Sequence, residues 1–389
     1  MNNNMDSEDY DDATEGSDDY KVSPEDFSDL FVIPSDWTVS TLRGEIDEIV
    51  DLNPEFQRRS VWSPMAKSKF IESLILGIPI PQILLAESRE RRNFYLVLDG
   101  KQRLLTIKEF FEGKHSNGAA FRLTGLKDLI DLNGKDWQAI SYQFPEYARA
   151  VEAAQIRTAI VRGWRNDNIL YEIFHRLNSG SVRLSPMELR MALLRGPFIA
   201  SVIRDTSDAD ALQAMLGLKA PDKRMKDVEI AIRHMAFSDG RVIYNGNLKD
   251  FIDEYCRLRN ADCKEHGEDL TDLAELIRAV DAGLEIFPKG SFSRRFLTES
   301  DEFDRPFNRA AFDVLAGSLV NKDVRNAALK QPAKFVDLWK KACSNAEFLR
   351  SIETTTKSIS ATKMRFQTWY GLVHNELGVA LIHPAIGNE

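Results

Sequence analysis

Apolar residues between 36 and 195 follow two periods, one typical of helices and one typical of buried strands. After Ser63 and Pro64 an apolar residue recurs every three or four positions as far as Gly77, which predicts an amphipathic helix with Ser63 as its N-cap. Short apolar runs predict strands at 82–86, 93–98 and 155–161. Further helices are predicted from Thr41 with Ser40 as N-cap, over 104–113, over 166–177 and after the Ser185–Glu188 capping box.

Beyond Gly196 few strand signals remain and helical stripes dominate. They cover 228–237, 248–258, 270–287, 310–319, 334–347 and 363–377. Before the first helix, Pro24 to Pro34 is predicted to be an extended lead-in. The predicted fold class is therefore α+β, with a tail and lead-in at 1–35, a small α/β domain at 36–195 and an all-helical domain at 196–389.

The charge of the chain is concentrated at its start. Eight acidic residues and no lysine or arginine lie within residues 1–19, so a formal net charge of −9 falls to −1 for the remainder. A segment this charged and this poor in apolar residues is predicted to be disordered. It acts either as a solvated tail or as a competitor of nucleic acid for a basic groove.

Several protein classes are excluded by composition. No apolar run approaches the roughly 20 residues that span a bilayer, and the first residues lack a signal-peptide pattern, so we expect a cytoplasmic protein. The three cysteines, Cys256, Cys263 and Cys343, are too few and too scattered for a disulfide framework or a zinc site. We expect them to be reduced and partly buried.

The candidate chemistry lies where the second predicted strand meets a helix. Asp99 ends the strand, Gly100 permits close backbone approach, and the N–H groups of the next helix favour an anion. Lys101 and Arg103 add positive charge, and Gln102 can orient a water. Asp99 is a candidate magnesium ligand or base. The alternative is an ordinary Asp-Gly turn.

Basic residues elsewhere supply further candidates. Gln57, Arg58 and Arg59 lie in a proline-bounded loop, and paired arginines suit bidentate contact with phosphate. Arg176 and Asn178, at the end of a predicted helix, are assigned to the rim of the same pocket. A second basic loop could contact a DNA backbone or be a solvated face; it contains Lys219, Lys223, Arg224 and Lys226.

Four motifs occur in a characteristic order: Gln57-Arg58 with Trp62, IESLILGIPIP, DGKQR and IFHRLNSGSVRLSPMELR. Together they resemble the N-terminal domain of the GmrSD-type restriction endonucleases, over about residues 37–195. The resemblance implies a ParB/sulfiredoxin-like fold, and nucleoside triphosphate binding and hydrolysis that regulates the restriction of phage or modified DNA. The family signature is Asp-Gly-Gln-Gln-Arg, so Lys101 replaces its first glutamine and leaves the choice of nucleotide open.

Many relatives carry a C-terminal HNH nuclease domain with clustered histidines. Here His374-Asn375 is an isolated pair, so the nuclease half is expected to be absent or supplied by another chain. The leading hypothesis is a nucleotide-dependent defence protein, an NTPase in which Asp99, Gln102 and Arg103 are catalytic. Two alternatives stay open: a non-catalytic nucleotide- or DNA-binding subunit for a partner nuclease, and a ParB-like nuclease that cuts DNA itself. A phage component is a further candidate partner, and the oligomeric state stays open.

Overall fold

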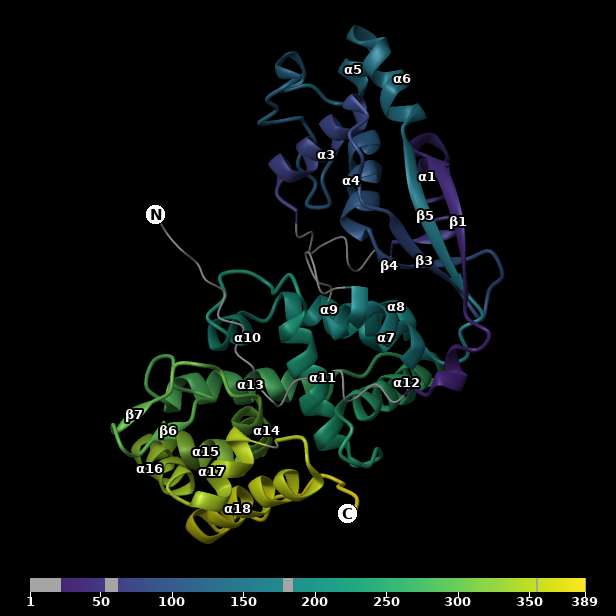
Figure 1. Cartoon of the computed structure of the whole chain (residues 1–389). Helices are drawn as coiled ribbons and strands as arrows, with labels where there is room; N and C mark the ends of the chain where they lie inside the picture. The colour runs from purple at the N-terminus through teal and green to yellow at the C-terminus, as the bar shows by residue number, and fades with distance from the viewer. Residues whose placement is uncertain (1–21, 53–61, 178–184, 355, 389) are drawn as a thin grey trace. The chain divides into compact units, whose positions relative to one another are not determined.

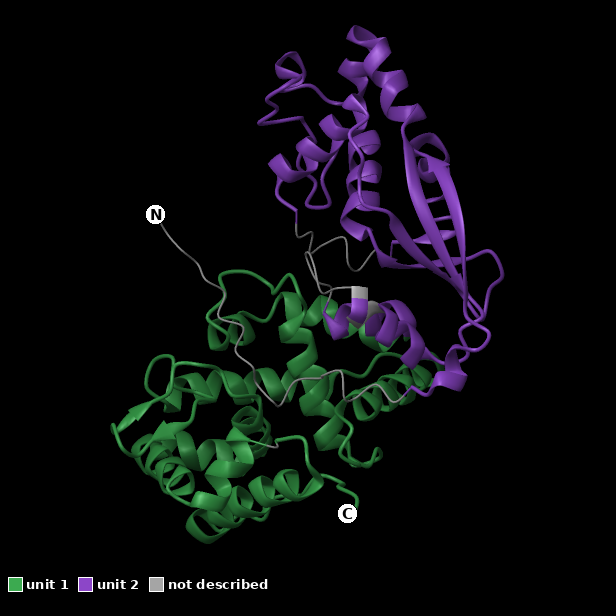
Figure 2. Ribbon diagram, viewed as in Figure 1, with its two compact units in different colours: residues 1–19, 194–389 green, residues 20–193 purple. Residues whose placement is uncertain are grey.

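The computed structural model describes residues 22–52, 62–177, 185–354 and 356–388. The chain forms two compact units, which divide between Leu193 and Leu194 (Figure 2). The unit that precedes this division contains a five-stranded sheet with helices, and the unit that follows is almost entirely helical. The α+β fold class predicted from the sequence is therefore confirmed.

The first unit alternates helices with strands, as its hydrophobic pattern predicts (Figure 1). Ser63 caps α3 by accepting the Ala66 N–H at 3.2 Å, and Gly77 ends this helix in a left-handed conformation. In chain order its elements are η2 (Pro24–Phe27), β1 (Phe31–Thr38), α1 (Val39–Glu45), β2 (Val50–Asp51), α3 (Pro64–Leu76), β3 (Ile83–Glu87), β4 (Tyr95–Asp99), α4 (Lys101–Glu112), η3 (Ile130–Leu132), α5 (Trp137–Gln143), α6 (Pro145–Ala153), β5 (Gln155–Arg162), α7 (Asp167–Leu177) and α8 (Pro186–Leu193).

Two predictions near the start of this unit are wrong. The predicted extended lead-in begins with a 3-10 helix, η2, and its last residues belong to strand β1, which pairs antiparallel with β5. This strand lies at the edge of the sheet and therefore tolerates Pro34, and none of its side chains is fully buried, so the usual strand pattern is hidden. Helix α1 is capped by Thr38, whose hydroxyl accepts the Thr41 N–H at 3.1 Å, and Ser40 lies inside the helix.

The sheet separates two hydrophobic layers. Its strand order is β1-β5-β3-β4-β2, with β3 parallel to β5 and antiparallel to β4. Because side chains alternate along a strand, Ile83 and Leu85 of β3 face the core formed with α1, α3, α4 and α6. Leu84 and Ala86 face the opposite core, which α7 and α8 cover. The middle strands are thus buried on both faces.

The second unit consists of helices and one short hairpin. The single helix predicted over 334–347 is two helices, because Asn345 accepts the Glu347 and Phe348 N–H groups and starts a new helix. In chain order the elements are α9 (Pro197–Ser207), α10 (Asp210–Met215), α11 (Lys226–Asp239), α12 (Leu248–His266), α13 (Thr271–Ile286), β6 (Phe296–Leu297), β7 (Glu302–Phe303), α14 (Arg309–Leu319), α15 (Lys322–Lys330), α16 (Pro332–Cys343), α17 (Ala346–Glu353) and α18 (Ile359–Leu377). Over the described ranges, none of the helices combines the length and apolar character needed to cross a bilayer.

A buried ionic triad joins three helices in the core of this unit. Asp313 on α14 accepts from Arg233 on α11 at 2.6 and 2.8 Å, and from Arg365 on α18 at 3.2 Å. All three side chains are at most 2% exposed. Burial also lowers the pKa of the neighbouring His234 to about 4, although the negative charge of Asp313 acts in the opposite direction. The folded unit therefore holds this histidine neutral.

The low pKa of His234 predicts that the helical unit loses stability between pH 7 and pH 5. The unfolded chain binds a proton below about pH 6.5 whereas the folded chain does not, so stability is full above this value and falls as the pH approaches 4. The expected loss at pH 5 is about 2 kcal/mol. In urea unfolding at both pH values, His234→Gln should show much less of this loss. An equal loss in both proteins would contradict the assignment.

Candidate functional site

The candidate site is built around a one-residue corner between β4 and α4. The strand ends at Asp99 and the helix begins at Lys101, so Gly100 alone makes the turn, at φ +94°. A Cβ added to Gly100 would lie 2.8 Å from Cγ1 of Ile83 on the neighbouring strand β3. Glycine is required here both by the backbone conformation and by the close approach of β3.

Arg103 holds this corner in place. Its guanidinium donates to the carboxylate of Asp99 at 2.8 Å, to the carbonyl of Gln82 at 3.0 Å and to the carbonyl of Pro81. The Arg103 side chain is only 10% exposed, whereas that of Asp99 is 49% exposed. The buried guanidinium of Arg103 therefore orients the carboxylate of Asp99, which reaches solvent.

The segment that contains Gln57, Arg58 and Arg59 lies outside the described residues. The described residues on either side of it contact β4 and α4, the two elements that form the corner. On one flank, β2 pairs parallel with β4, with Asp51 opposite Leu96. On the other, the backbone N–H of Trp62 donates to the side-chain oxygen of Gln102 at 3.3 Å. The chain therefore leaves and re-enters the described structure beside the strand and helix that form the corner.

A buried charge cluster fixes α3 against α4. Glu109 of α4 pairs with Lys67 of α3 and accepts the backbone N–H of Ser116 at 2.9 Å, and Nδ1 of His115 lies 3.2 Å from its carboxylate. Burial raises the pKa of Glu109, but the hydrogen bonds from Lys67 and Ser116 outweigh burial and lower it overall. The cluster keeps the start of α3, which follows Trp62, against α4.

The assignment of Arg176 and Asn178 to the rim of the pocket stays a prediction. Asn178 lies outside the described residues. Arg176 is on α7, its side chain is 74% exposed, and its Nε lies 2.5 Å from a carboxylate oxygen of Glu172. Helix α7 covers the face of the sheet opposite to α4. Among the described residues, Arg176 pairs with Glu172 and makes no hydrogen bond or ion pair with the residues of the corner.

Asp99 can hold a magnesium ion only together with other ligands. Across the described residues, no three histidine, cysteine or acidic side chains gather in a group able to hold a metal. The carboxylate of Asp99 uses Oδ2 for Arg103, and Oδ1 has no hydrogen bond within the described chain. Magnesium is commonly held by one or two carboxylates, substrate phosphates and waters. This donor set therefore fits a magnesium ion that arrives with its phosphate ligand.

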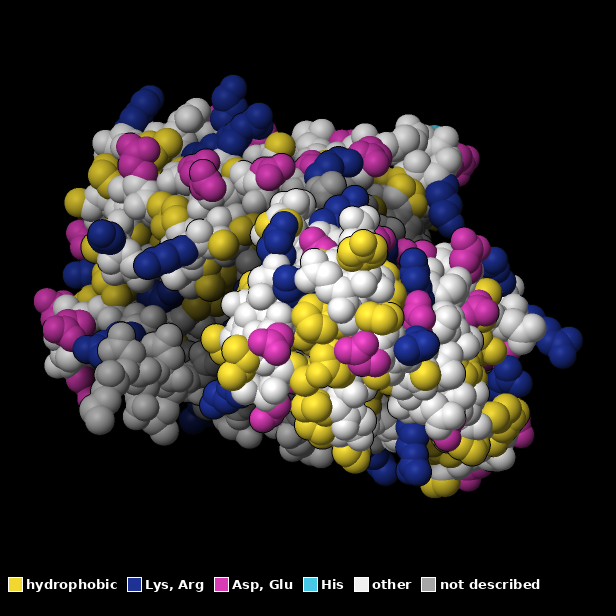
Figure 3. Space-filling view, turned by 90° about the horizontal axis from the view of Figure 1, so that it is seen from above, with side chains coloured by type: hydrophobic (Ala, Val, Ile, Leu, Met, Phe, Trp, Pro, Cys, Tyr) yellow, Lys and Arg dark blue, Asp and Glu magenta, His cyan; other side chains and the backbone are white. Residues whose placement is uncertain are grey.

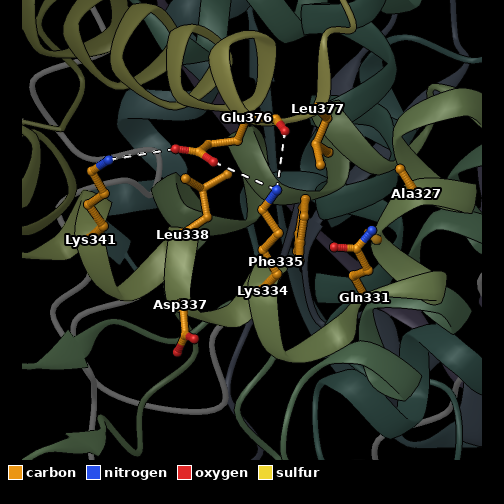
Figure 4. A pocket seen from close by; sticks show the side chains of 10 residues that line it. Ala327, Gln331, Lys334, Phe335, Asp337, Leu338, Lys341, Glu376 and Leu377 are labelled. Carbon is orange, nitrogen blue, oxygen red and sulfur yellow. Dashed lines mark hydrogen bonds and ion pairs between the residues drawn. The ribbon is translucent and has the colours of Figure 1, made fainter.

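A cavity in the helical unit does not resemble a reaction site. It has a volume of about 170 Å³ and lies between α15, α16 and the end of α18 (Figure 4). Lys334 and Lys341 on its rim both pair with Glu376, each at 3.8 Å, so its charges neutralise one another. Basic and acidic side chains are also interspersed, around a hydrophobic group, on the face shown in Figure 3. The paired charges of the cavity do not favour a highly charged ligand.

The comparison with known protein families matches the region that contains this corner. Residues 39–195 match the family model described as the GmrSD restriction endonuclease, N-terminal domain. This stretch of the chain is therefore similar to that domain. The match covers less than half of the chain, and no curated protein or solved structure matches the chain. The match points to a restriction-system protein. Most of strand β1 lies before the matched region, so the sheet extends beyond it.

The sequence alone did not predict the residues that support the corner. Ile83 excludes a side chain at position 100, and Pro81 and Gln82 supply carbonyls to Arg103. The IPIP stretch that precedes Gln82 belongs to one of the motifs that resemble the family. The motif by itself does not predict that its last residue, Pro81, contacts Arg103. The position of the IPIP stretch, directly before strand β3, could have indicated this contact, because β3 neighbours β4 in the sheet.

Replacing Gly100 tests the corner directly. Gly100→Ala forces an unfavourable φ, at about 1–2 kcal/mol, and drives a methyl group into Ile83, at about 1–3 kcal/mol more. Gly113→Ala at the other end of α4 is the matched control, because φ is +71° there and no atom lies within 4 Å of the added methyl. Urea unfolding should show the greater loss for Gly100→Ala. Equal losses would exclude the close packing against β3.

Proposed function

We propose that the corner from Asp99 to Arg103 binds a nucleoside triphosphate with magnesium and hydrolyses it to regulate DNA restriction. The observation that carries the proposal is a half-exposed carboxylate, oriented by a buried arginine, directly before the N-terminus of the 12-residue helix α4. Helix N-termini attract anions, and Lys101 adds a positive charge at the first helical position. The match to the GmrSD restriction endonuclease family supports the link to DNA.

Each residue of the corner has a proposed role. Asp99 holds magnesium through Oδ1 or accepts a proton from the attacking water, and Gln102 orients this water. Lys101, together with Arg58 and Arg59, contacts the phosphates. Arg103 acts through Asp99, as a positioning residue. Because phosphoryl transfer depends mainly on positioning and on neutralising phosphate charge, a corner with one acid and several cations is chemically sufficient.

One observation favours a second function, nucleotide binding without hydrolysis. Asp99 is the only acid of the DGKQR motif, and half of its carboxylate is already bonded to Arg103. If Asp99 cannot also serve as ligand or base, the bound nucleotide acts as a switch for a separate nuclease subunit. Saturable binding of a triphosphate without release of phosphate would support this function.

Asp99→Asn tests the first function. The amide retains the shape of the side chain but loses its charge, so phosphate release from the common triphosphates should fall at least about a hundredfold. Asp47→Asn is the matched control. Like Asp99, Asp47 is about half exposed, at 42%, and pairs with a basic residue of α4, but this residue is Lys108, away from the corner. This control should retain full turnover. Equal turnover in both variants would overturn the assignment of Asp99.

A further inference from the structure

A compact basic turn connects α10 to α11 in the helical unit. Gly217 ends α10 with φ +70°, and the N–H of Leu218 donates back to the carbonyl of Gln213 at 2.8 Å. Asp222 then organises the next four residues. Its side chain accepts the backbone N–H groups of Arg224 at 3.3 Å and Lys226 at 2.9 Å. Both ends of the turn are therefore held by hydrogen bonds.

Met225 determines which side chains of the turn face outward. It adopts φ +63°, which is rare for a side chain of this size, and is fully buried. Its N–H donates to the carbonyl of Asp222 at 3.1 Å. With Met225 anchored in the core, the neighbouring side chains point to solvent. Four cations are exposed on this turn: Lys219, Lys223, Arg224 and Lys226.

These four cations gather within residues 219–226, whereas most arginines of the unit are each paired with an acid. Most arginines here are neutralised locally, as are Arg241 by Asp239, Arg295 by Asp304 and Arg325 by Glu275. Over the part of the chain that the structure describes, none of the four cations of the turn has an ion pair. The carboxylate of Asp222 is directed to the backbone of its own turn. The turn therefore presents a local excess of positive charge.

We propose that this turn, residues 219–226, contacts the phosphate backbone of double-stranded DNA. The site lies outside the region that matches the GmrSD N-terminal domain and does not depend on the nucleotide chemistry proposed for Asp99. Lysine and arginine side chains on a fixed turn bind successive phosphates without reading base sequence. The helical unit thereby supplies sequence-independent affinity for the DNA that a restriction system acts on.

The composition of the turn favours nucleic acid over an acidic protein. Protein interfaces depend on buried aromatic or apolar anchors surrounded by polar residues. Among the described residues, no large hydrophobic side chain between 216 and 226 is strongly exposed. Contact with phosphates needs no such anchor, because its free energy comes mainly from the release of counterions. The turn therefore provides what a DNA backbone requires and lacks what a protein partner requires.

The test is binding of the full chain to a fluorescent DNA duplex of mixed sequence at several salt concentrations. The double variant Lys223→Glu with Arg224→Glu should weaken binding about tenfold or more, and should reduce the slope of log affinity against log salt by about 2. The control is Lys264→Glu with Lys322→Glu, which makes the same charge change at exposed positions of the same unit. It should bind within about twofold of the unmodified chain.

Several results would overturn the proposal. Equal weakening in both double variants would mean that only net charge matters. Competition by polyglutamate as effective as that by unlabelled DNA would point to an acidic protein, and variant-sensitive binding to anionic vesicles would point to a membrane. The alanine pair Lys223→Ala with Arg224→Ala repeats the slope measurement if charge reversal impairs folding. The contact proposed for residues 219–226 involves no nucleotide, so failure of the nucleotide proposal leaves this one intact.

Discussion

The close approach of β3 to Gly100 is the constraint on which the candidate site depends. Because Gly100 has no side chain and adopts a positive φ, the strand can end and the helix begin within one residue, directly beside Ile83. This short connection brings Asp99 within one helical turn of Arg103, which reaches past the corner to the carbonyls before β3. The exposed acid, the buried arginine and the helix N-terminus are therefore consequences of one packing contact.

Local patterns predicted much of this arrangement from the sequence. The strands β3, β4 and β5, the caps of α3 and the helix after DGKQR follow from periodicity and from residues with special backbone preferences. The edge strand β1 was missed, because it packs on one neighbour only and contains Pro34. The contacts of Arg103 with Pro81 and Gln82 could not be predicted either, because these carbonyls lie about 20 residues earlier in the chain and belong to the backbone.

The helical unit shows the same limit more clearly. Its helices follow from apolar stripes, yet Arg233 and Arg365 look like ordinary surface charges on helices in the sequence. Their partner Asp313 is 80 residues from one and 52 from the other. Breaking such a buried group by removing one member costs about 3–5 kcal/mol, so it specifies how α11, α14 and α18 pack. No local rule identifies a contact of this kind.

The two proposed sites share one structural device and differ in how each uses its acid. Helices α4 and α11 both follow a residue with positive φ, Gly100 or Met225, and both begin with a lysine. At the first corner Asp99 keeps one carboxylate oxygen available and reaches solvent, which suits a metal ion and an attacking water. At the second, Asp222 uses both oxygens for its own backbone, and four exposed cations surround it. The first arrangement suits phosphate chemistry, and the second suits phosphate contact alone.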